Sequence, residues 1–167
     1  GSGLGRTAAA RPARGMPLVL GLPSPIRTRV DPNRGHGATF HAAFDDMLPL
    51  CDFLSINCAS TPQTRGIVSA HALALMPVDS IVVNAARGDI VDDEALIAAL
   101  KSGKIAAAGL DVFKGEPNID PRHRELENVF MLPHLGSATK NTRIAMGMKA
   151  VDNLQDFFRG KRTRAIL

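Results

Sequence analysis

Arg87, Asp111 and His134 are three side chains that could perform chemistry if the fold brings them together. The planar guanidinium of an arginine matches a carboxylate through paired hydrogen bonds. An imidazole, with an ordinary pKa of about 6.5, can give or take a proton near neutral pH. Such a group of residues could hold an acidic small molecule and protonate it.

Each of these residues comes at the end of a predicted strand. β-Branched and apolar runs predict strands, and helical patterns fill the intervals between them. We expect strands at 53–56, 81–84, 105–112 and 129–132, and helices at 69–76, 92–103 and about 139–158. This alternation predicts an α/β, Rossmann-like, doubly wound parallel sheet with helices on both faces. Such sheets bind ligands at the carboxyl ends of their strands, where the three residues would meet.

The predicted helices carry local start and stop signals. Ser69 is the expected N-cap of the first, and Asp92 the expected N-cap of the second, which Gly103 ends. The closing helix has an apolar stripe at near-helical spacing, which is typical of a face packed against other elements. The stripe comprises Ile144, Met148, Val151, Leu154 and Phe158, and we expect Met146 and Met148 to lie in the core.

A glycine-rich run opens the chain. Gly3 and Gly5 begin a G-x-G-x-x-A pattern that ends at Ala8 and could let backbone amides approach a pyrophosphate at a helix N-terminus. The pattern should follow a strand, and only two residues precede it. The alternative reading is a flexible glycine-rich end.

Composition limits the classes of function. The chain is 45% hydrophobic and 22% charged, as in one globular domain. It has no apolar run long enough to span a membrane and no signal-peptide pattern, so we predict a cytoplasmic protein without a membrane partner. Residues 1–36 hold six arginines and one acidic residue, so the basic excess is local. With no Trp or Tyr to stack on bases, nucleic-acid binding is disfavoured.

The two cysteines form no recognisable motif. Cys51 and Cys58 are seven positions apart, which is neither a disulfide framework nor a CxxC pair. We expect reduced, buried thiols and no metal site.

Four ordered motifs make the chain from Gly37 to about Gly160 resemble a known family. They are Cys51-Asp52-Phe53-Leu54-Ser55-Ile56-Asn57 with Ser60-Thr61-Pro62-Gln63-Thr64-Arg65-Gly66, Val82-Val83-Asn84-Ala85-Ala86-Arg87-Gly88-Asp89-Ile90-Val91-Asp92, Gly109-Leu110-Asp111-Val112-Phe113 with Gly115-Glu116-Pro117, and Leu132-Pro133-His134-Leu135-Gly136-Ser137-Ala138-Thr139. The sequence resembles the NAD(P)-binding domain of the D-isomer-specific 2-hydroxyacid dehydrogenases, most of all the glyoxylate/hydroxypyruvate reductases.

The resemblance implies roles for particular residues. Arg87 would grip the carboxylate and carbonyl oxygen of a small 2-oxo acid, His134 would be the acid/base, and Glu116 the carboxylate behind it. Hydride would pass between NAD(P)H and the substrate. The implied cofactor-binding residues are Gly3, Gly5, Asn57, Thr61, Ala85, Asp111 and Gly136. Relatives pair through this domain, so a homodimer is also expected.

The chain departs from the family in its first part. The family's first strand and its separate substrate domain are missing, so we expect an incomplete fold, and Pro12 stands where a helix interior is expected. We divide the chain into an irregular, poorly matching start at 1–36, a dinucleotide-binding domain at 37–160 and a tail at 161–167. Arg27 and Arg29 stand where NAD-preferring members have an acidic residue, which slightly favours NADP over NAD.

Other functions remain open. The chain could be a non-catalytic, truncated remnant, or a dinucleotide-sensing corepressor that shares the same Arg, Glu and His. Because the substrate domain is missing, we expect little turnover from the 167-residue chain alone.

Overall fold

The computed structural model describes residues 8–10, 18–21, 38–41 and 43–161. The predictions for Gly3, Gly5, Pro12, Arg27 and Arg29 lie outside these residues. The chain divides into two compact units, Gly5–Pro133 and a second that holds Gly1–Leu4 and His134–Leu167. The first unit contains the sheet, and the second contains one long helix.

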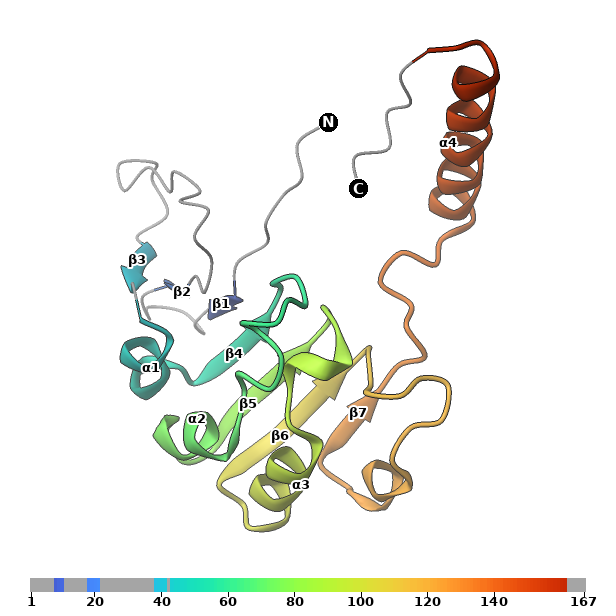
Figure 1. The fold of residues 1–167 in the computed structure, drawn as a ribbon. Helices are drawn as coiled ribbons and strands as arrows, with labels where there is room; N and C mark the ends of the chain where they lie inside the picture. The colour runs from blue at the N-terminus through green and yellow to red at the C-terminus, as the bar shows by residue number, and fades with distance from the viewer. Residues whose placement is uncertain (1–7, 11–17, 22–37, 42, 162–167) are drawn as a thin grey trace. The chain divides into compact units, whose positions relative to one another are not determined.

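A sheet with four consecutive parallel strands forms the first unit (Figure 1). These strands are β4 (Phe53–Ile56), β5 (Ser80–Asn84), β6 (Ile105–Leu110) and β7 (Val129–Met131). β5 pairs in parallel with β4 on one side and with β6 on the other, and β6 pairs in parallel with β7. All four predicted strands are therefore confirmed, as is the Rossmann-like α/β class, and their carboxyl ends lie along one edge.

Three short strands extend the sheet beyond β4, in the order β3-β2-β1-β4. β1 (Ala8–Ala10) is antiparallel to both β2 (Leu18–Gly21) and β4, whereas β3 (Ala38–His41) is parallel to β2. The glycine-rich pattern thus runs into a strand at Ala8, where a dinucleotide fingerprint would open a helix. Pairing with the edge of β4 satisfies backbone groups and outweighs the helix propensity of three alanines.

The hydrophobic core lies between one face of β4–β6 and the helices. The helical segments of this unit are α1 (Phe44–Met47), η1 (Leu48–Leu50), α2 (Ala70–Leu75), η2 (Gly88–Ile90), α3 (Asp93–Lys101) and η3 (Pro121–Glu125). Figure 1 shows α2 and α3 lying over the strands. Val82 and Leu54 of the sheet are fully buried, against Leu73 of α2 and Leu96 of α3 in the same cluster.

The predicted helix caps are confirmed. The Ser69 hydroxyl accepts the backbone N–H of Ala72 at 3.3 Å, and the Asp92 carboxylate accepts that of Ala95 at 3.2 Å. Gly103, which follows the Ser102 C-cap of α3, has φ +75°, a left-handed conformation that glycine adopts without strain. These local interactions fix the two ends of α3, the helix that follows the loop carrying Arg87.

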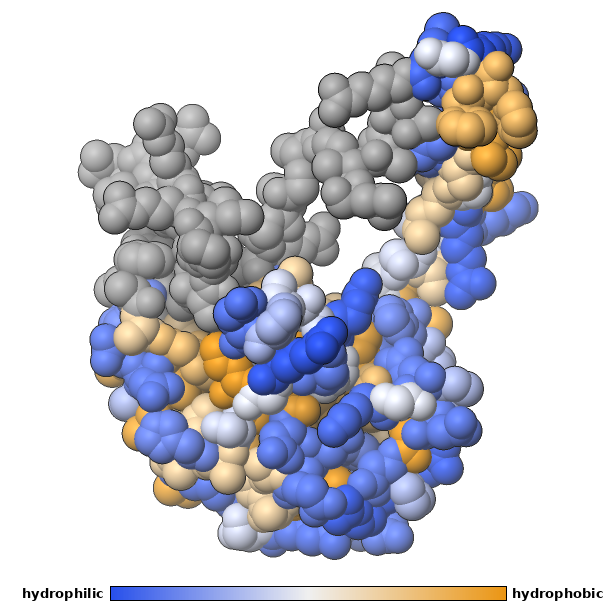
Figure 2. Space-filling view, viewed as in Figure 1, coloured by the Kyte–Doolittle hydropathy of each residue, from blue (hydrophilic) through white to orange (hydrophobic). Residues whose placement is uncertain are grey.

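The second unit is dominated by α4 (Lys140–Phe158), which Thr139 caps. Its apolar stripe is exposed, and Figure 2 shows hydrophobic residues on its surface. Met146 is 61% and Met148 54% exposed, so the prediction that they lie in the core is wrong. The described residues of this unit contain no second helix or strand against which the stripe could pack.

The cysteines are free, and only one is fully buried. Burial, with a smaller effect of the neighbouring Asp52, raises the pKa of the Cys51 thiol to about 11. Cys58 is half-buried, so the prediction that both thiols are buried is wrong for it, because it follows β4 into the loop at the sheet edge.

Among the described residues, no helix has the length and apolar character needed to cross a membrane.

Candidate active site

Arg87 is held at the carboxyl end of β5 by a buried asparagine. The Asn84 side chain is 1% exposed, and its amide donates to the Arg87 carbonyl at 2.9 Å. Its side-chain oxygen accepts the Ala86 N–H at 3.1 Å. These two bonds close a tight turn after the strand and leave the Arg87 side chain exposed, with Nη1 donating to the Ala86 carbonyl at 2.6 Å. The guanidinium has further N–H donors with which it could bind a ligand.

Gly88 brings the Arg87 turn against the loop that follows β6. A β-carbon on Gly88 would lie 1.9 Å from the carbonyl carbon of Phe113 and 2.3 Å from the backbone nitrogen of Lys114. Only a residue without a side chain allows this approach. The turn after β5 and the segment 113–114 are therefore in direct backbone contact.

Glu116 belongs to that same loop. Its Oε1 accepts the backbone N–H of Phe113 at 2.6 Å, and the side chain is exposed. Asp111 precedes this turn, is half-buried, and donates its backbone N–H to the Asn84 carbonyl at 2.9 Å. The structure thus brings Arg87, Asp111 and Glu116 onto two adjoining loops at one edge of the sheet.

The loop after β4 lies on the other side of β5. The Asn57 amide donates to the Ser55 hydroxyl at 2.9 Å. Thr64, which is 2% exposed, has a hydroxyl that accepts the Thr61 N–H at 2.8 Å and donates to the Ala59 carbonyl at 2.7 Å. These bonds fold residues 57–64 into a defined loop, with Asn57 and Thr61 half-buried.

His134 and Gly136 belong to the second unit, and both are exposed. His134 has φ +56°, a left-handed conformation that costs a non-glycine residue about 1–3 kcal/mol and is frequent at functional sites. Because Arg87 and Glu116 lie in the other unit, the meeting of all three side chains stays a prediction.

Three residues that shape the loops at this edge were not singled out from the sequence: Asn84, Thr64 and Asp89. Asn84 and Thr64 act through hydrogen bonds to nearby backbone, and a polar residue at the end of an apolar strand was the available signal for Asn84. The partners of Asp89 are Ser60 and Arg65, which are 29 and 24 positions away in the chain. No local sequence pattern could therefore indicate its role.

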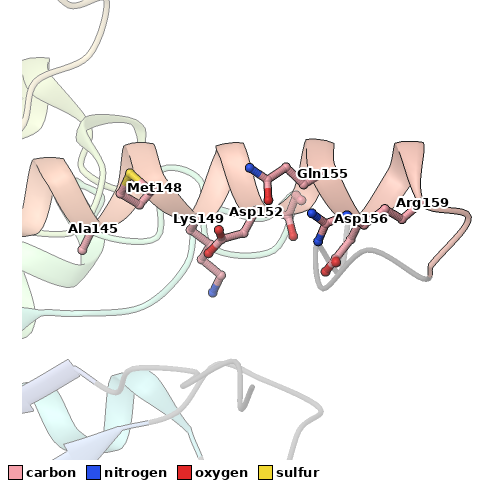
Figure 3. Close-up of a pocket in the computed structure, with 8 residues that line it drawn as sticks. Ala145, Met148, Lys149, Asp152, Gln155, Asp156 and Arg159 are labelled. Atoms are coloured by element: carbon pink, nitrogen blue, oxygen red, sulfur yellow. The ribbon is translucent and has the colours of Figure 1, made fainter.

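A groove along α4 is not this edge. Figure 3 shows the charged side chains of Lys149, Asp152, Asp156 and Arg159 distributed along the helix. The described residues that line the groove belong to α4, apart from its C-cap Arg159, and none is a predicted site residue. The candidate site is therefore defined by the loops after β4, β5 and β6.

Parallel strands with polar loops at their carboxyl edge are typical of the α/β domains that bind dinucleotides. The family model described as D-isomer specific 2-hydroxyacid dehydrogenase, NAD binding domain, matches residues 3–136. The chain belongs to this family of NAD(P)-dependent oxidoreductases, and the matched region is the NAD-binding domain.

Curated relatives agree with the family assignment. A glycerate dehydrogenase of Hyphomicrobium methylovorum is 39% identical over 92% of this chain and 48% of its own length. A glyoxylate/hydroxypyruvate reductase B of Erwinia tasmaniensis is 48% identical over 70% of this chain and 37% of its own length. The chain therefore spans less than half the length of either relative.

Solved structures give the same result. An NADPH-dependent glyoxylate/hydroxypyruvate reductase of Sinorhizobium meliloti, in complex with NADP and malonate, matches 76% of this chain and 40% of its own, with a TM-score of 0.71 and 39% identity. The holo form of Rhodotorula graminis D-mandelate dehydrogenase matches 88% of this chain and 42% of its own, with a TM-score of 0.78 and 28% identity.

Proposed function

We propose that the chain is the part of an oxidoreductase that binds the cofactor and bears the catalytic residues, transferring hydride between NAD(P)H and a small 2-oxo acid of the glyoxylate/hydroxypyruvate type. The observation that carries the proposal is the backbone contact of Gly88 with Phe113 and Lys114. This contact supports a single site in which the Arg87 turn and the Glu116 loop act together.

The sheet edge fits a nicotinamide dinucleotide. Ala85 is exposed and small at the end of β5, which leaves room beside the strand. The half-buried Asn57 and Thr61 on one side, and Asp111 on the other, offer polar groups for the ribose and carboxamide. When bound, the cofactor supplies the hydride.

The proposed roles of the chain's residues follow from their chemistry. Arg87 turns its guanidinium toward the substrate and binds the carboxylate through its planar fork. As the carbonyl carbon gains a hydride, negative charge builds on its oxygen, and His134 donates the proton that completes the 2-hydroxy acid. In this proposal, the Glu116 carboxylate orients the imidazole.

Either NAD or NADP fits the family, and we propose a preference for NADP. The argument rests on Arg27 and Arg29, whose guanidinium groups could bind a 2′-phosphate. Their positions lie outside the described residues. NADP in the similar Sinorhizobium meliloti reductase supports the same choice.

We also propose that the protein forms a homodimer and acts in the cytoplasm. The exposed apolar side chains of α4, including Leu154 at 59% and Phe158 at 82%, support self-association, because large apolar patches mark interaction sites. The substrate remains a small 2-oxo acid in this proposal, and the division of the chain at residues 36 and 160 stays a prediction.

Binding and turnover should be measured separately. NADPH is titrated into the 167-residue chain by nicotinamide fluorescence, and absorbance then follows glyoxylate reduction. The proposal requires saturable NADPH binding, with little turnover from the chain alone. Absence of any nicotinamide binding would contradict the proposal. Robust turnover would overturn only the expectation that the chain alone has little activity.

A further inference from the structure

Asp89 receives three interactions from the loop that follows β4. The Ser60 hydroxyl donates to Asp89 Oδ2 at 2.7 Å, and Arg65 Nε lies 3.1 Å from the same oxygen. The backbone N–H of Gly66 donates to the Asp89 carbonyl at 2.9 Å. Asp89 itself belongs to η2, directly after the turn that carries Arg87. One residue therefore joins the loop after β4 to the loop after β5.

The junction continues as a backbone ladder. Val68 donates its N–H to the Ile90 carbonyl at 3.2 Å, and Asp92 donates its N–H to the Val68 carbonyl at 3.1 Å. Val68 and Ile90 are almost fully buried, with 1% and 0% exposure. This ladder does not use the Asp89 carboxylate, so it holds the two segments together when that carboxylate is replaced.

The carboxylate contributes little to stability by itself. The side chains of Arg65 and Asp89 are 63% and 36% exposed, and ion pairs at such exposure contribute about 0–1 kcal/mol. The hydrogen bond from Ser60 matters because of where it lies. Ser60 is the immediate neighbour of Thr61, in the loop that we propose binds the cofactor. The side chain of Asp89 therefore connects two loops that the backbone ladder already holds near each other.

The same residue is linked to Arg87 through the backbone. Ile90 donates its N–H to the Arg87 carbonyl at 3.3 Å, and Val91 donates to the Gly88 carbonyl at 3.2 Å, so residues 87–91 form one tight turn. A β-carbon on Gly88 would clash with the backbone of Phe113, so this turn lies directly against the segment after β6. The Asp89 carboxylate therefore links the Ser60–Thr61 segment to this turn.

We propose that Asp89 is a positioning residue that couples cofactor occupancy of residues 57–61 to the placement of Arg87, so that nicotinamide cofactor and 2-oxo acid bind cooperatively. The inference rests on the proposed function, because it needs both ligands at this edge. Coupling between sites is reciprocal, so an acid that improves cofactor binding is itself bound better when the cofactor is present.

The test is a coupling measurement on the 167-residue chain. NADPH is titrated with and without saturating oxamate, a small unreactive analogue of a 2-oxo acid. In the unaltered chain, oxamate should tighten NADPH binding by about 5-fold or more, the lower end of usual allosteric couplings. Asp89→Ala, which removes the acceptor of the Ser60 hydroxyl, should keep NADPH binding without oxamate and reduce the coupling factor to about 1. Asp89→Glu, which retains a carboxylate, should restore part of it.

Two further variants complete the test. One is a matched control, and the other removes the hydrogen-bond donor to Asp89. Asp79→Asn changes an exposed aspartate in a left-handed turn, which asparagine also adopts well, and should leave the coupling unchanged. Ser60→Ala removes the hydroxyl donor to the Asp89 carboxylate, and should weaken coupling even if Asp89→Ala does not fold.

The possible results separate the two proposals. If the unaltered chain binds NADPH and oxamate without coupling, or if Asp89→Ala and Ser60→Ala keep the full coupling, the role of Asp89 is overturned while the proposed function stands. If the unaltered chain binds neither ligand, the proposed function fails and the role of Asp89 falls with it.

Discussion

Gly88 and Phe113, 25 positions apart in the chain, are in such close backbone contact that a β-carbon on Gly88 would lie 1.9 Å from the Phe113 carbonyl carbon. The contact joins the turn that presents Arg87 to the loop that presents Glu116. It lies at the carboxyl edge of the parallel strands, where α/β domains of this class bind their ligands.

Gly88→Ala should therefore destabilise the first unit. The added methyl meets backbone, which cannot rotate away, so we expect a loss at or above the usual overpacking cost of about 1–3 kcal/mol. Denaturant unfolding measures it. Gly147→Ala is the matched control, because a β-carbon there meets nothing within 4 Å and α4 gains helix propensity. Equal stability of the two variants would contradict the backbone contact.

Arg87→Lys should weaken substrate handling, because an ammonium cannot reproduce the planar fork of a guanidinium. In an active polypeptide that contains this chain, we expect kcat/KM for glyoxylate to fall while the affinity for NADPH is retained. Steady-state kinetics and cofactor titration measure the two quantities. An unchanged kcat/KM would argue against paired hydrogen bonds from Arg87.

His134→Ala should remove the proposed general acid. In the same active polypeptide, kcat should fall by about 10²–10⁴, the usual contribution of such a group. NADPH binding should remain, which distinguishes loss of chemistry from loss of the site. Near-normal turnover would exclude His134 from the mechanism.

The dependence of stability on pH under acidic conditions should be set partly by Asp120. Hydrogen bonds from the Arg122 side chain, and then from its backbone N–H, lower the pKa of Asp120 to about 2. An unfolded aspartate titrates at about 3.9, so this stabilisation is complete above that pH and is lost as the pH falls toward 2. Asp120→Asn should lower the Tm at neutral pH by an amount that shrinks between about pH 4 and 2. A Tm difference independent of pH would contradict the ion pair.

Sequence patterns predicted what depends on neighbouring residues. The caps at Ser69 and Asp92, and the four parallel strands, follow from side chains close in the chain, and the structure confirms them. The antiparallel pairing of Ala8–Ala10 depends instead on an available edge of β4, which three alanines do not encode.

Two further differences between the prediction and the structure have similar causes. The stripe on α4 predicted a buried face, but a pattern does not specify which element covers it, and Met146 and Met148 are exposed. Asp89 was missed because its partners Ser60 and Arg65 are 29 and 24 positions away. Arg87 was found from its place after a predicted strand and Glu116 through the family resemblance, and the structure adds the backbone contact that joins their loops.

The most direct test of the central claim is a crystal structure of the chain with NADP and oxamate. We predict the Arg87 guanidinium and the His134 imidazole within hydrogen-bonding distance of oxamate, with the Glu116 carboxylate on the far side of the imidazole. Ligands bound at the sheet edge with His134 out of reach of both oxamate and Glu116 would contradict the account.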